Sequence, residues 1–318
     1  MRALVTGGAG FIGSTLVDRL LAEGHSVDVV DDLSTGAIAN LTDARSAGRE
    51  FRFHQLDVRA PELVELMARR EPEVVFHLAA QTSVAASVRW PVLDGEVNVV
   101  GTVQVLEGAR AARSRKVVYA ASGGTLYGEP GPADLPLAET HPHDPRSPYG
   151  VSKKAAVDYL RAYAGLYGLG WCALALANVY GPRQDPHGEA GVVSIFAANL
   201  VAGRESTIDG DGAQTRDFVY VDDVVDAFSR AAQRGDGMLV NVGTGAQTSV
   251  AELYAAMVEA NGGGPAAKHG PRREGDMRDS ALDPTRAAIH LGWTPWTPLS
   301  DGLRAVLAYA GREGAGRT

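Results

Sequence analysis

The residues of this sequence best suited to chemistry are a tyrosine and a lysine four positions apart, Tyr149 and Lys153, in the stretch SPYGVSKK. On a helix, residues at this spacing share one face, one turn apart. A lysine ammonium beside a phenol can lower the phenol pKa through its charge and can also hydrogen bond a cofactor ribose. We therefore expect the tyrosine to act as a base near neutral pH. Because the same spacing is common on solvated helix faces, the pair needs support from elsewhere in the chain.

A glycine-rich stretch near the N-terminus gives that support. Gly7, Gly10 and Gly13 lie between a predicted strand and a predicted helix. Such glycines permit a tight turn, a close approach of the backbone to a pyrophosphate and close packing of the helix on the sheet. Asp31 closes the next predicted strand, where an acid accepts hydrogen bonds from ribose hydroxyls and repels a 2′-phosphate, so NAD is predicted rather than NADP. The alternative is a structural glycine turn with a capping aspartate.

The elements that must hold these residues alternate between strands and helices. Continuous apolar runs predict strands at 3–6, 26–30, 51–57, 74–80, 116–122 and 172–180, and helical patterns predict helices at 11–23, 61–70, 92–112 and 149–167. Runs that are apolar throughout indicate strands buried on both faces. The alternation predicts an α/β fold, a Rossmann-type doubly wound parallel sheet with right-handed crossovers.

The pattern loosens after residue 180. A loop rich in glycine and proline precedes a predicted helix at 192–202, a strand followed by a helix at 216–232, and one more strand at 238–245. We expect residues 1–178 to form the NAD-binding domain. Residues 179–318 should form mainly a smaller C-terminal substrate-binding lobe, with about 216–245 returning to the core of the first domain.

Composition narrows the classes of function. The 318 residues carry a formal net charge of −8, which disfavours nucleic acid and anionic membranes as partners. Cys172 is the only cysteine, so no intramolecular disulfide can form and a reducing cytoplasm is expected. No apolar run approaches the roughly 18 residues of a membrane span, and we expect no leader peptide ahead of the first strand. We expect no bound metal.

The two motifs together resemble the extended short-chain dehydrogenases/reductases, the NAD-dependent epimerase/dehydratase family, which act on nucleotide sugars. The resemblance runs nearly end to end. It includes HLAAQTSV (77–84), NVVGT (98–102), LYGEP (126–130), NVYGPRQDPHGEAGVV (178–193), RDFVYVDD (216–223), VNVGTG (240–245), RREGD (272–276) and LGWTP (291–295). Within the family, the chain most resembles the short UDP-glucose (UDP-galactose) 4-epimerases of bacteria and archaea.

The resemblance implies roles for further residues. The cofactor would be bound by Phe11 and Ile12 at the pyrophosphate, Asp31 and Asp32 at the ribose, Asp57 and Val58 beside the adenine, and Leu78, Ala79, Ala80 and Asn98 along its length. The diphosphate and nucleoside of the substrate would be held by Asn178, Arg216, Arg273 and Asp276. Arginines that hold the phosphates would leave the sugar free to rotate. The alternative for both arginines is surface charge.

The resemblance also implies the reaction. Tyr149 would remove the proton of the sugar 4-hydroxyl while C4 gives a hydride to NAD, and the resulting 4-keto sugar would turn and take the hydride back on its other face. The family usually places a serine or threonine at the position of Gly123, to hydrogen bond the 4-oxygen. We expect Ser122, or with less support Thr125, to take that role, with Gly123 and Gly124 leaving space for a rotating hexose. A packing accident at the end of a strand is the alternative.

Three other activities are alternatives for a chain with these motifs. A nucleotide-sugar 4,6-dehydratase needs an acidic pair just before the Tyr-Gly corner, and Gly124, Thr125 and Leu126 stand there instead. A UDP-glucuronate 4-epimerase or decarboxylase stays open, because the residues that would read the carboxylate are not located. A non-catalytic NAD(H)-sensing protein is disfavoured, because such relatives tend to lose the tyrosine or the lysine and this chain keeps both.

Two more expectations follow from the resemblance. The helices at 92–112 and 149–167 carry more small and apolar residues than packing on one sheet face requires, and in the family they pair across a two-fold axis, so a homodimer is expected. The residue four positions after Asp276 would wall the pocket for the sugar's 2-substituent. Here it is the small Ser280, so UDP-N-acetylhexosamines should fit as well as UDP-hexoses. The alternative is that Ser280 only caps a turn.

Overall fold

The computed structural model describes residues 1–186, 191–272 and 277–315, and its main feature is a seven-stranded parallel sheet in the order β11-β6-β5-β4-β1-β2-β3. The strands are β1 (Arg2–Thr6), β2 (Ser26–Asp31), β3 (Phe51–Gln55), β4 (Val74–His77), β5 (Lys116–Ser122), β6 (Gly170–Leu176) and β11 (Met238–Val242). The strand order reverses between β1 and β4, and doubly wound sheets bind their ligands outside the carboxyl ends of the strands at such a point. The predicted fold class is confirmed.

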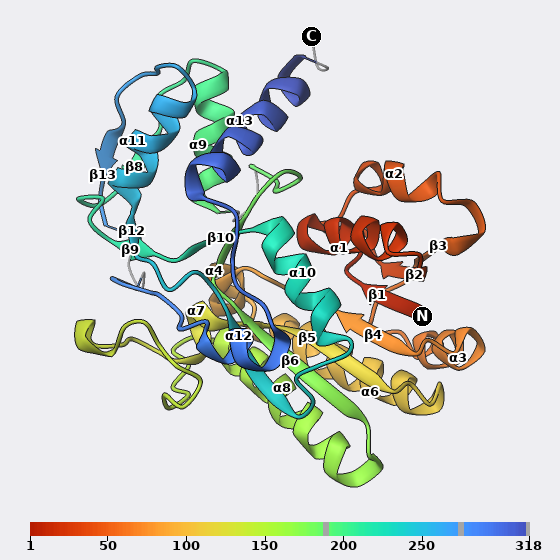
Figure 1. Cartoon of the computed structure of the whole chain (residues 1–318). Helices are drawn as coiled ribbons and strands as arrows, with labels where there is room; N and C mark the ends of the chain where they lie inside the picture. Colours follow the sequence, from red (N-terminus) through yellow and green to blue (C-terminus); the bar gives the residue numbers. More distant parts are fainter. Residues whose placement is uncertain (187–190, 273–276, 316–318) are drawn as a thin grey trace.

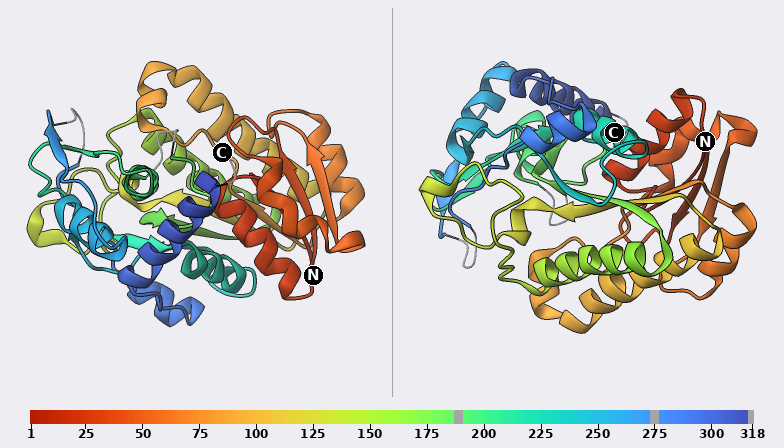
Figure 2. Two further views of the ribbon diagram at one scale, coloured as in Figure 1. Left: turned by 90° about the horizontal axis from the view of Figure 1, so that it is seen from above. Right: turned by 60° about the horizontal axis from the view of Figure 1, so that its bottom comes forward.

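Helices cover both faces of this sheet (Figure 1). On one face, α1 (Phe11–Ala22) and α10 (Val221–Ala231) contribute to a core with the apolar side chains of the strands. On the other face, α3 (Glu62–Arg70), α6 (Gly101–Ala111) and α8 (Pro148–Tyr167) build a second core. Figure 2 shows α6 and α8 side by side along this second face. The sheet is therefore buried on both sides, as its apolar runs predicted.

The predicted helix at 92–112 is confirmed to within one residue at each end, but it contains a π-helical turn and follows a short separate helix, neither of which was predicted. The chain forms α4 (Val84–Arg89), α5 (Pro91–Gly95), a π-helical turn (Glu96–Val100) and then α6. Pro91 starts a new helix because its ring fixes φ and it lacks the N–H that would continue α4. The π-helical turn changes which side chains of this region face inward, and such turns are frequent at functional sites.

The predicted strand at 172–180 is also divided. After β6, a short strand β7 (Asn178–Tyr180) leaves the main sheet and pairs in parallel with β10 (Phe218–Tyr220). The predicted strand at 74–80 ends at His77. The following residues turn towards the glycine-rich loop, because the N–H of Leu78 donates to the Thr6 carbonyl at 3.1 Å.

A smaller lobe lies at the carboxyl end of the sheet and has its own core. Its helices α9, α11 and α13 gather at the upper left of Figure 1, away from the N-terminal strands. Its elements are α9 (Val192–Val201), β8 (Thr207–Asp209), β9 (Thr215–Arg216), β12 (Thr248–Ser249), α11 (Val250–Ala260), β13 (Lys268–Gly270) and α13 (Leu299–Ala315). Two elements that lie between these in the sequence do not belong to the lobe. The strand β11 joins the main sheet, and α10 packs against one face of that sheet.

The remaining elements are short. They are α2 (Thr42–Arg45), α7 (Gly123–Leu126), α12 (Thr285–Leu291) and 3-10 turns at Ile38–Leu41, Gly48–Glu50 and Pro132–Asp134. No helix in the three described ranges combines the length and the apolar character needed to cross a membrane.

Candidate active site

The glycine-rich loop turns tightly between β1 and α1. Gly7 has a φ of +69°, and a Cβ atom there would lie 2.6 Å from the backbone of the segment that follows β4. A Cβ atom at Gly13 would lie 2.1 Å from the Gly7 carbonyl oxygen, so the loop and α1 approach each other as only glycine allows. Gly10 has no side chain to cap α1. The N–H groups of Phe11 and Ile12 are therefore available to an anion such as a pyrophosphate, and the loop fits NAD.

Asp31 ends β2 beside this loop. Its carboxylate is 7% exposed and accepts hydrogen bonds from the N–H groups of Ala9 at 2.9 Å and Leu33 at 2.8 Å. Burial raises the pKa of Asp31 above its ordinary value, and the charge of Asp32 adds to the rise. Asp32 is exposed and accepts hydrogen bonds from the N–H and hydroxyl of Ser34, at 2.9 and 2.6 Å. Asp31 thus holds the backbone on both sides of the predicted ribose site, in addition to its predicted contact with the ribose.

The residues expected beside the adenine follow β3. Asp57 pairs with Arg59, and hydrogen bonds from this guanidinium lower the pKa of Asp57. Val58 is buried, and a Cβ atom at Gly101 would lie 2.9 Å from its side chain. Arg59 also lies 3.5 Å from Glu96, so this edge of the predicted site carries an ion-pair network that sequence reasoning missed.

The segment Leu78, Ala79 and Ala80, which is predicted to line the cofactor, follows β4. A buried histidine, His77, connects this part of the chain to β1 by hydrogen bonds. Thr102 donates its hydroxyl hydrogen to the Asn98 carbonyl at 2.6 Å, so it must accept from His77 Nε2 at 3.0 Å. His77 Nδ1 then accepts from the Thr6 hydroxyl at 2.7 Å. Thr6 Oγ1 in turn accepts the N–H of Ala79 at 3.3 Å.

Burial lowers the pKa of His77 to about 3, and the charge of Lys153 adds to this effect. His77 is therefore a neutral structural residue with both ring nitrogens hydrogen bonded. Sequence reasoning gave it no role. A single polar residue inside an otherwise apolar strand was the signal that could have found it.

The structure brings Tyr149 and Lys153 together in the first turns of α8. Lys153 is 3% exposed, and its ammonium donates to the Ala120 carbonyl oxygen at 3.0 Å. The ammonium nitrogen lies 5.8 Å from the centre of the Tyr149 ring and 4.9 Å from that of Tyr119, so it sits between two aromatic faces. The Ser122 hydroxyl, at the end of β5, acts on the Tyr149 phenol and lowers its pKa.

The net shift of the Tyr149 phenol pKa is upward in this structure, not downward as predicted from the neighbouring lysine. Burial raises the pKa of Tyr149 to about 12, and the hydrogen bond from Ser122 offsets only part of the rise. Burial also lowers the pKa of Lys153 to about 8. The physical reason is that the ammonium binds the Ala120 carbonyl rather than the phenol, and the loss of hydration disfavours both charged forms.

Two glycines and a threonine follow Ser122 in α7. A Cβ atom at Gly123 would lie 2.3 Å from the Leu282 side chain, so a larger residue there would displace Leu282. A Cβ atom at Gly124 would meet nothing within 4 Å, which agrees with open space at this point. Thr125 Oγ1 is buried, and within the described part of the chain it has no hydrogen-bond partner.

The predicted substrate residues that the structure describes lie on β7, on β9 and in the segment before α12. Asn178 begins β7, and its N–H donates to the Asp217 carbonyl at 2.9 Å, next to Arg216. The Arg216 guanidinium donates to the Thr215 carbonyl at 2.7 Å. Ser280 is 4% exposed. The predicted substrate residues Arg273 and Asp276 fall outside the described residues.

Asp217 joins three parts of this region and was not predicted. Its buried carboxylate accepts the hydroxyl of Thr244 at 2.6 Å and the N–H groups of Thr244, Gly245 and Leu282 at 2.8, 3.0 and 3.2 Å. Burial raises its pKa above the ordinary value. It therefore fixes the segment that carries Ser280 against the strand that carries Arg216. Its place inside the RDFVYVDD motif was the available signal.

Comparisons with known proteins agree with this arrangement. Residues 4–306 match a family model described as GDP-mannose 4,6 dehydratase. The chain is 53% identical over 310 residues to the UDP-glucose 4-epimerase of Mycolicibacterium smegmatis, with 97% of this chain and 98% of that protein covered.

Two solved structures are similar over almost their whole length. The UDP-glucose 4-epimerase of Thermotoga maritima with UDP-glucose has a TM-score of 0.94 at 43% identity, covering 99% of this chain and 100% of that one. The Thermus thermophilus UDP-glucose 4-epimerase in complex with NAD has a TM-score of 0.90 at 42% identity, covering 98% and 99%. The chain therefore belongs to the NAD-dependent epimerase/dehydratase family of extended short-chain dehydrogenases/reductases.

Proposed function

We propose that the protein is an NAD-dependent UDP-glucose 4-epimerase, which interconverts UDP-glucose and UDP-galactose through a transient 4-keto sugar. The observation that carries this proposal is the cluster of Ser122, Tyr149 and Lys153 at the carboxyl end of β5. That end lies two strands from β1 and its glycine-rich loop, at the same edge of the parallel sheet. The likeness to UDP-glucose 4-epimerases over nearly the full chain supports it.

Each residue of the cluster has a separate task. In its phenolate form, Tyr149 takes the proton of the sugar 4-hydroxyl and later returns it, while the Ser122 hydroxyl stabilises charge on the same oxygens. Lys153 holds a positive charge beneath the phenol and can reach a cofactor ribose. NAD, when bound, supplies the acceptor and donor of the hydride at C4. Asn178 and Arg216, with Arg273 and Asp276, would hold the nucleoside diphosphate while the sugar turns.

The site argues against the dehydratase activity of other family members. Dehydration needs a base for the C5 proton and an acid for the leaving hydroxyl at C6. The structure places Gly124, Thr125 and Leu126 on α7 at the position where those members carry acids. None of these three residues carries a carboxyl group that could act as the acid or the base in that step.

The direct test is to incubate the purified protein with UDP-galactose and no added NAD, and to measure UDP-glucose. We expect conversion, because epimerisation regenerates NAD in each turnover and the cofactor should co-purify. A parallel reaction with UDP-glucuronate separates the glucuronate activities from the proposed one. Absence of conversion, together with an acid extract that lacks adenine absorbance, would contradict the proposal.

Ser280 supports a wider substrate range. The residue after it, Ala281, accepts the N–H of Leu137 at 2.9 Å, and the next, Leu282, packs at Gly123 beside the catalytic cluster. A large side chain at position 280 would therefore intrude where a substituent on the sugar must fit.

We expect wild-type protein to act on UDP-N-acetylgalactosamine as well as on UDP-galactose, and Ser280→Tyr to lose at least about tenfold in kcat/KM on the N-acetyl substrate alone. Ser280→Ala is the matched control, since it removes the hydroxyl but keeps the residue small, and it should retain both activities. If the tyrosine variant accepts both substrates equally, the pocket is not limited at Ser280.

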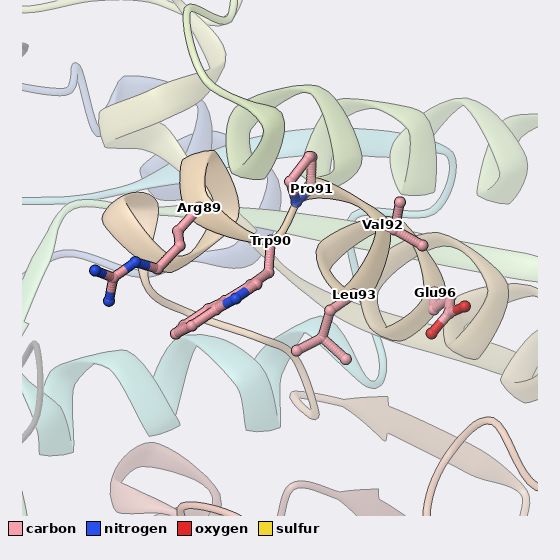
Figure 3. A pocket seen from close by; sticks show the side chains of 6 residues that line it. All are labelled: Arg89, Trp90, Pro91, Val92, Leu93 and Glu96. Carbon is pink, nitrogen blue, oxygen red and sulfur yellow. The ribbon is translucent and has the colours of Figure 1, made fainter.

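The helices α4, α5 and α8 expose an unusual number of large apolar side chains. Trp90 and Leu93 point outward around α5, where the ring of Trp90 lies 5.2 Å from the Arg89 guanidinium (Figure 3). Val92 is 73% exposed on the same helix, and Leu166 is 71% exposed on α8. Apolar side chains gathered on neighbouring helices mark interaction surfaces. We propose that a second copy of this chain covers this surface, as the helical pattern predicted.

Light scattering should therefore give about twice the 33.4 kDa of one chain. Val92→Glu should shift the protein towards the single-chain mass, because it would place a charge in the interface. Ile289→Glu, which alters an equally exposed side chain on α12, should leave the mass unchanged. A wild-type mass of one chain would contradict the dimer.

A further inference from the structure

A buried carboxylate lies behind the catalytic pair and has no part in the chemistry described so far. Asp94 on α5 is 1% exposed. One of its oxygens accepts hydrogen bonds from Gln81 Nε2 at 2.8 Å and Asn98 Nδ2 at 3.1 Å. Burying a carboxylate is costly unless donors and opposite charge compensate for the lost hydration. The retention of this charge in the interior therefore calls for a role.

Asn98 carries the contact from Asp94 to the catalytic helix. Its amide nitrogen also lies 3.1 Å from Ser152 Oγ, and the Ser152 hydroxyl donates to the Tyr149 carbonyl oxygen at 3.0 Å. A continuous chain of hydrogen bonds thus runs from Asp94 through Asn98 and Ser152 to the backbone of Tyr149. Asn98 lies in the π-helical turn, which directs its side chain towards α8.

Gln81 carries a second contact from Asp94 to the segment that should line the cofactor. Its side chain donates to the Ser83 carbonyl at 2.9 Å and accepts the Ser83 N–H, while its backbone N–H donates to Asn98 Oδ1 at 2.8 Å. Hydrogen bonds through both the side chain and the backbone of Gln81 therefore hold the turn after Ala80. Asp94 lies where the two branches meet.

We propose that Asp94 is a positioning residue for the Tyr149–Lys153 pair, which it holds through Asn98 and Ser152 and to which it contributes a buried negative charge. This inference rests on the proposed epimerase function. A carboxylate suits the place better than a carboxamide, because it has no N–H that could face the two amide donors, and its charge strengthens both hydrogen bonds.

The negative charge of Asp94 acts on both Lys153 and Tyr149. The titratable groups that face Lys153 are His77 on β4, Tyr119 on β5, Tyr149 on α8 and Asp94 on α5. His77 is neutral, and both tyrosines are protonated at neutral pH because burial raises the pKa of each. Asp94 is thus the group that favours the ammonium form of Lys153, against burial, and it also disfavours the phenolate form of Tyr149.

Asp94→Asn tests the charge, since it keeps an acceptor oxygen and the shape. Without the negative charge, the ammonium loses its stabilisation and the phenolate loses its repulsion, so the pKa of both groups should fall. We expect both limbs of the pH profile of kcat to move to lower pH by roughly half a unit or more. Glu65→Gln, which removes an exposed carboxylate from α3, should leave the profile in place.

A second readout does not depend on turnover. The near-ultraviolet absorbance of the Tyr149 phenolate is isolated by subtracting the titration of the matching Tyr149→Phe protein. Its midpoint should be lower in Asp94→Asn than in wild type. A protein inactive on UDP-galactose at every pH would refute the proposed function but not this inference, whereas unchanged midpoint and profile would overturn the inference alone.

Asp94→Ala tests the positioning, since it removes the acceptor too. We expect kcat to fall about ten- to a hundredfold with KM for UDP-galactose within about twofold, because a displaced base affects chemistry more than binding. If this variant does not fold, Ser152→Ala breaks the same chain at its other end and should give a smaller loss in kcat with the same unchanged KM. Full kcat in the folded variant would overturn the positioning role.

Discussion

Tyr149→Phe should bind NAD as tightly as wild type and lose about 10²- to 10⁴-fold in kcat, the usual contribution of a single general acid–base group. The change removes one oxygen and keeps the ring, which contacts the Lys153 ammonium at 5.8 Å. The packing of α8 should therefore survive. Lys153→Ala should be at least as damaging, because it removes the charge beneath the phenol and the hydrogen bond to the Ala120 carbonyl.

A matched control lies on the same helix. Tyr159→Phe also removes one phenol oxygen from α8, but Tyr159 is 41% exposed and lies on the outer side of the helix. It should retain wild-type kcat. The measurement is the rate of UDP-glucose formation from UDP-galactose, with the NAD content of each protein determined beforehand. Near-wild-type turnover in Tyr149→Phe that contains NAD would remove the proposed mechanism.

The parallel sheet and its main helices could be predicted from the sequence because both faces of the sheet are buried. A strand covered on both sides must be apolar throughout, so β1, β2, β4, β5 and β6 stand out as continuous runs. The helix at 92–112 could be predicted as well, but α4 and the π-helical turn at Glu96–Val100 could not. The turn serves buried polar contacts of Asp94 and Asn98, and periodicity of apolar residues carries no information about such contacts.

The candidate site was predicted in part for a similar reason. The spacing of Tyr149 and Lys153 reveals that they share a helix face, which is a local property. The direction in which each pKa shifts depends on burial by β4, β5 and α5, which are distant in the sequence. The same limit applies to Asp217, whose carboxylate accepts hydrogen bonds from residues far along the chain.

Ser122→Ala should lower kcat by roughly ten- to a thousandfold, as the loss of one positioned hydrogen bond to a reacting oxygen does. It should also move the acid limb of the pH profile to higher pH. The sign follows from the structure, because the hydrogen bond from Ser122 lowers the pKa of Tyr149 and its removal lets burial raise that pKa further. This shift is opposite to the one expected for Asp94→Asn. The two variants therefore separate the stabilisation of the Tyr149 phenolate by Ser122 from its repulsion by Asp94.

Thr125→Val is the comparison that assigns the hydroxyl. Valine has nearly the shape of threonine, and Thr125 Oγ1 is buried without a hydrogen-bond partner in the part of the chain that the structure describes. If that oxygen has no ligand, its loss relieves an unsatisfied polar atom, and the variant should keep its kcat and unfold at the same or a higher temperature. If it binds the sugar 4-oxygen, kcat should fall while Ser122→Ala stays active. That reverse ranking would move the role to Thr125, one turn further along α7, and would leave Ser122 as a neighbour of the phenol alone.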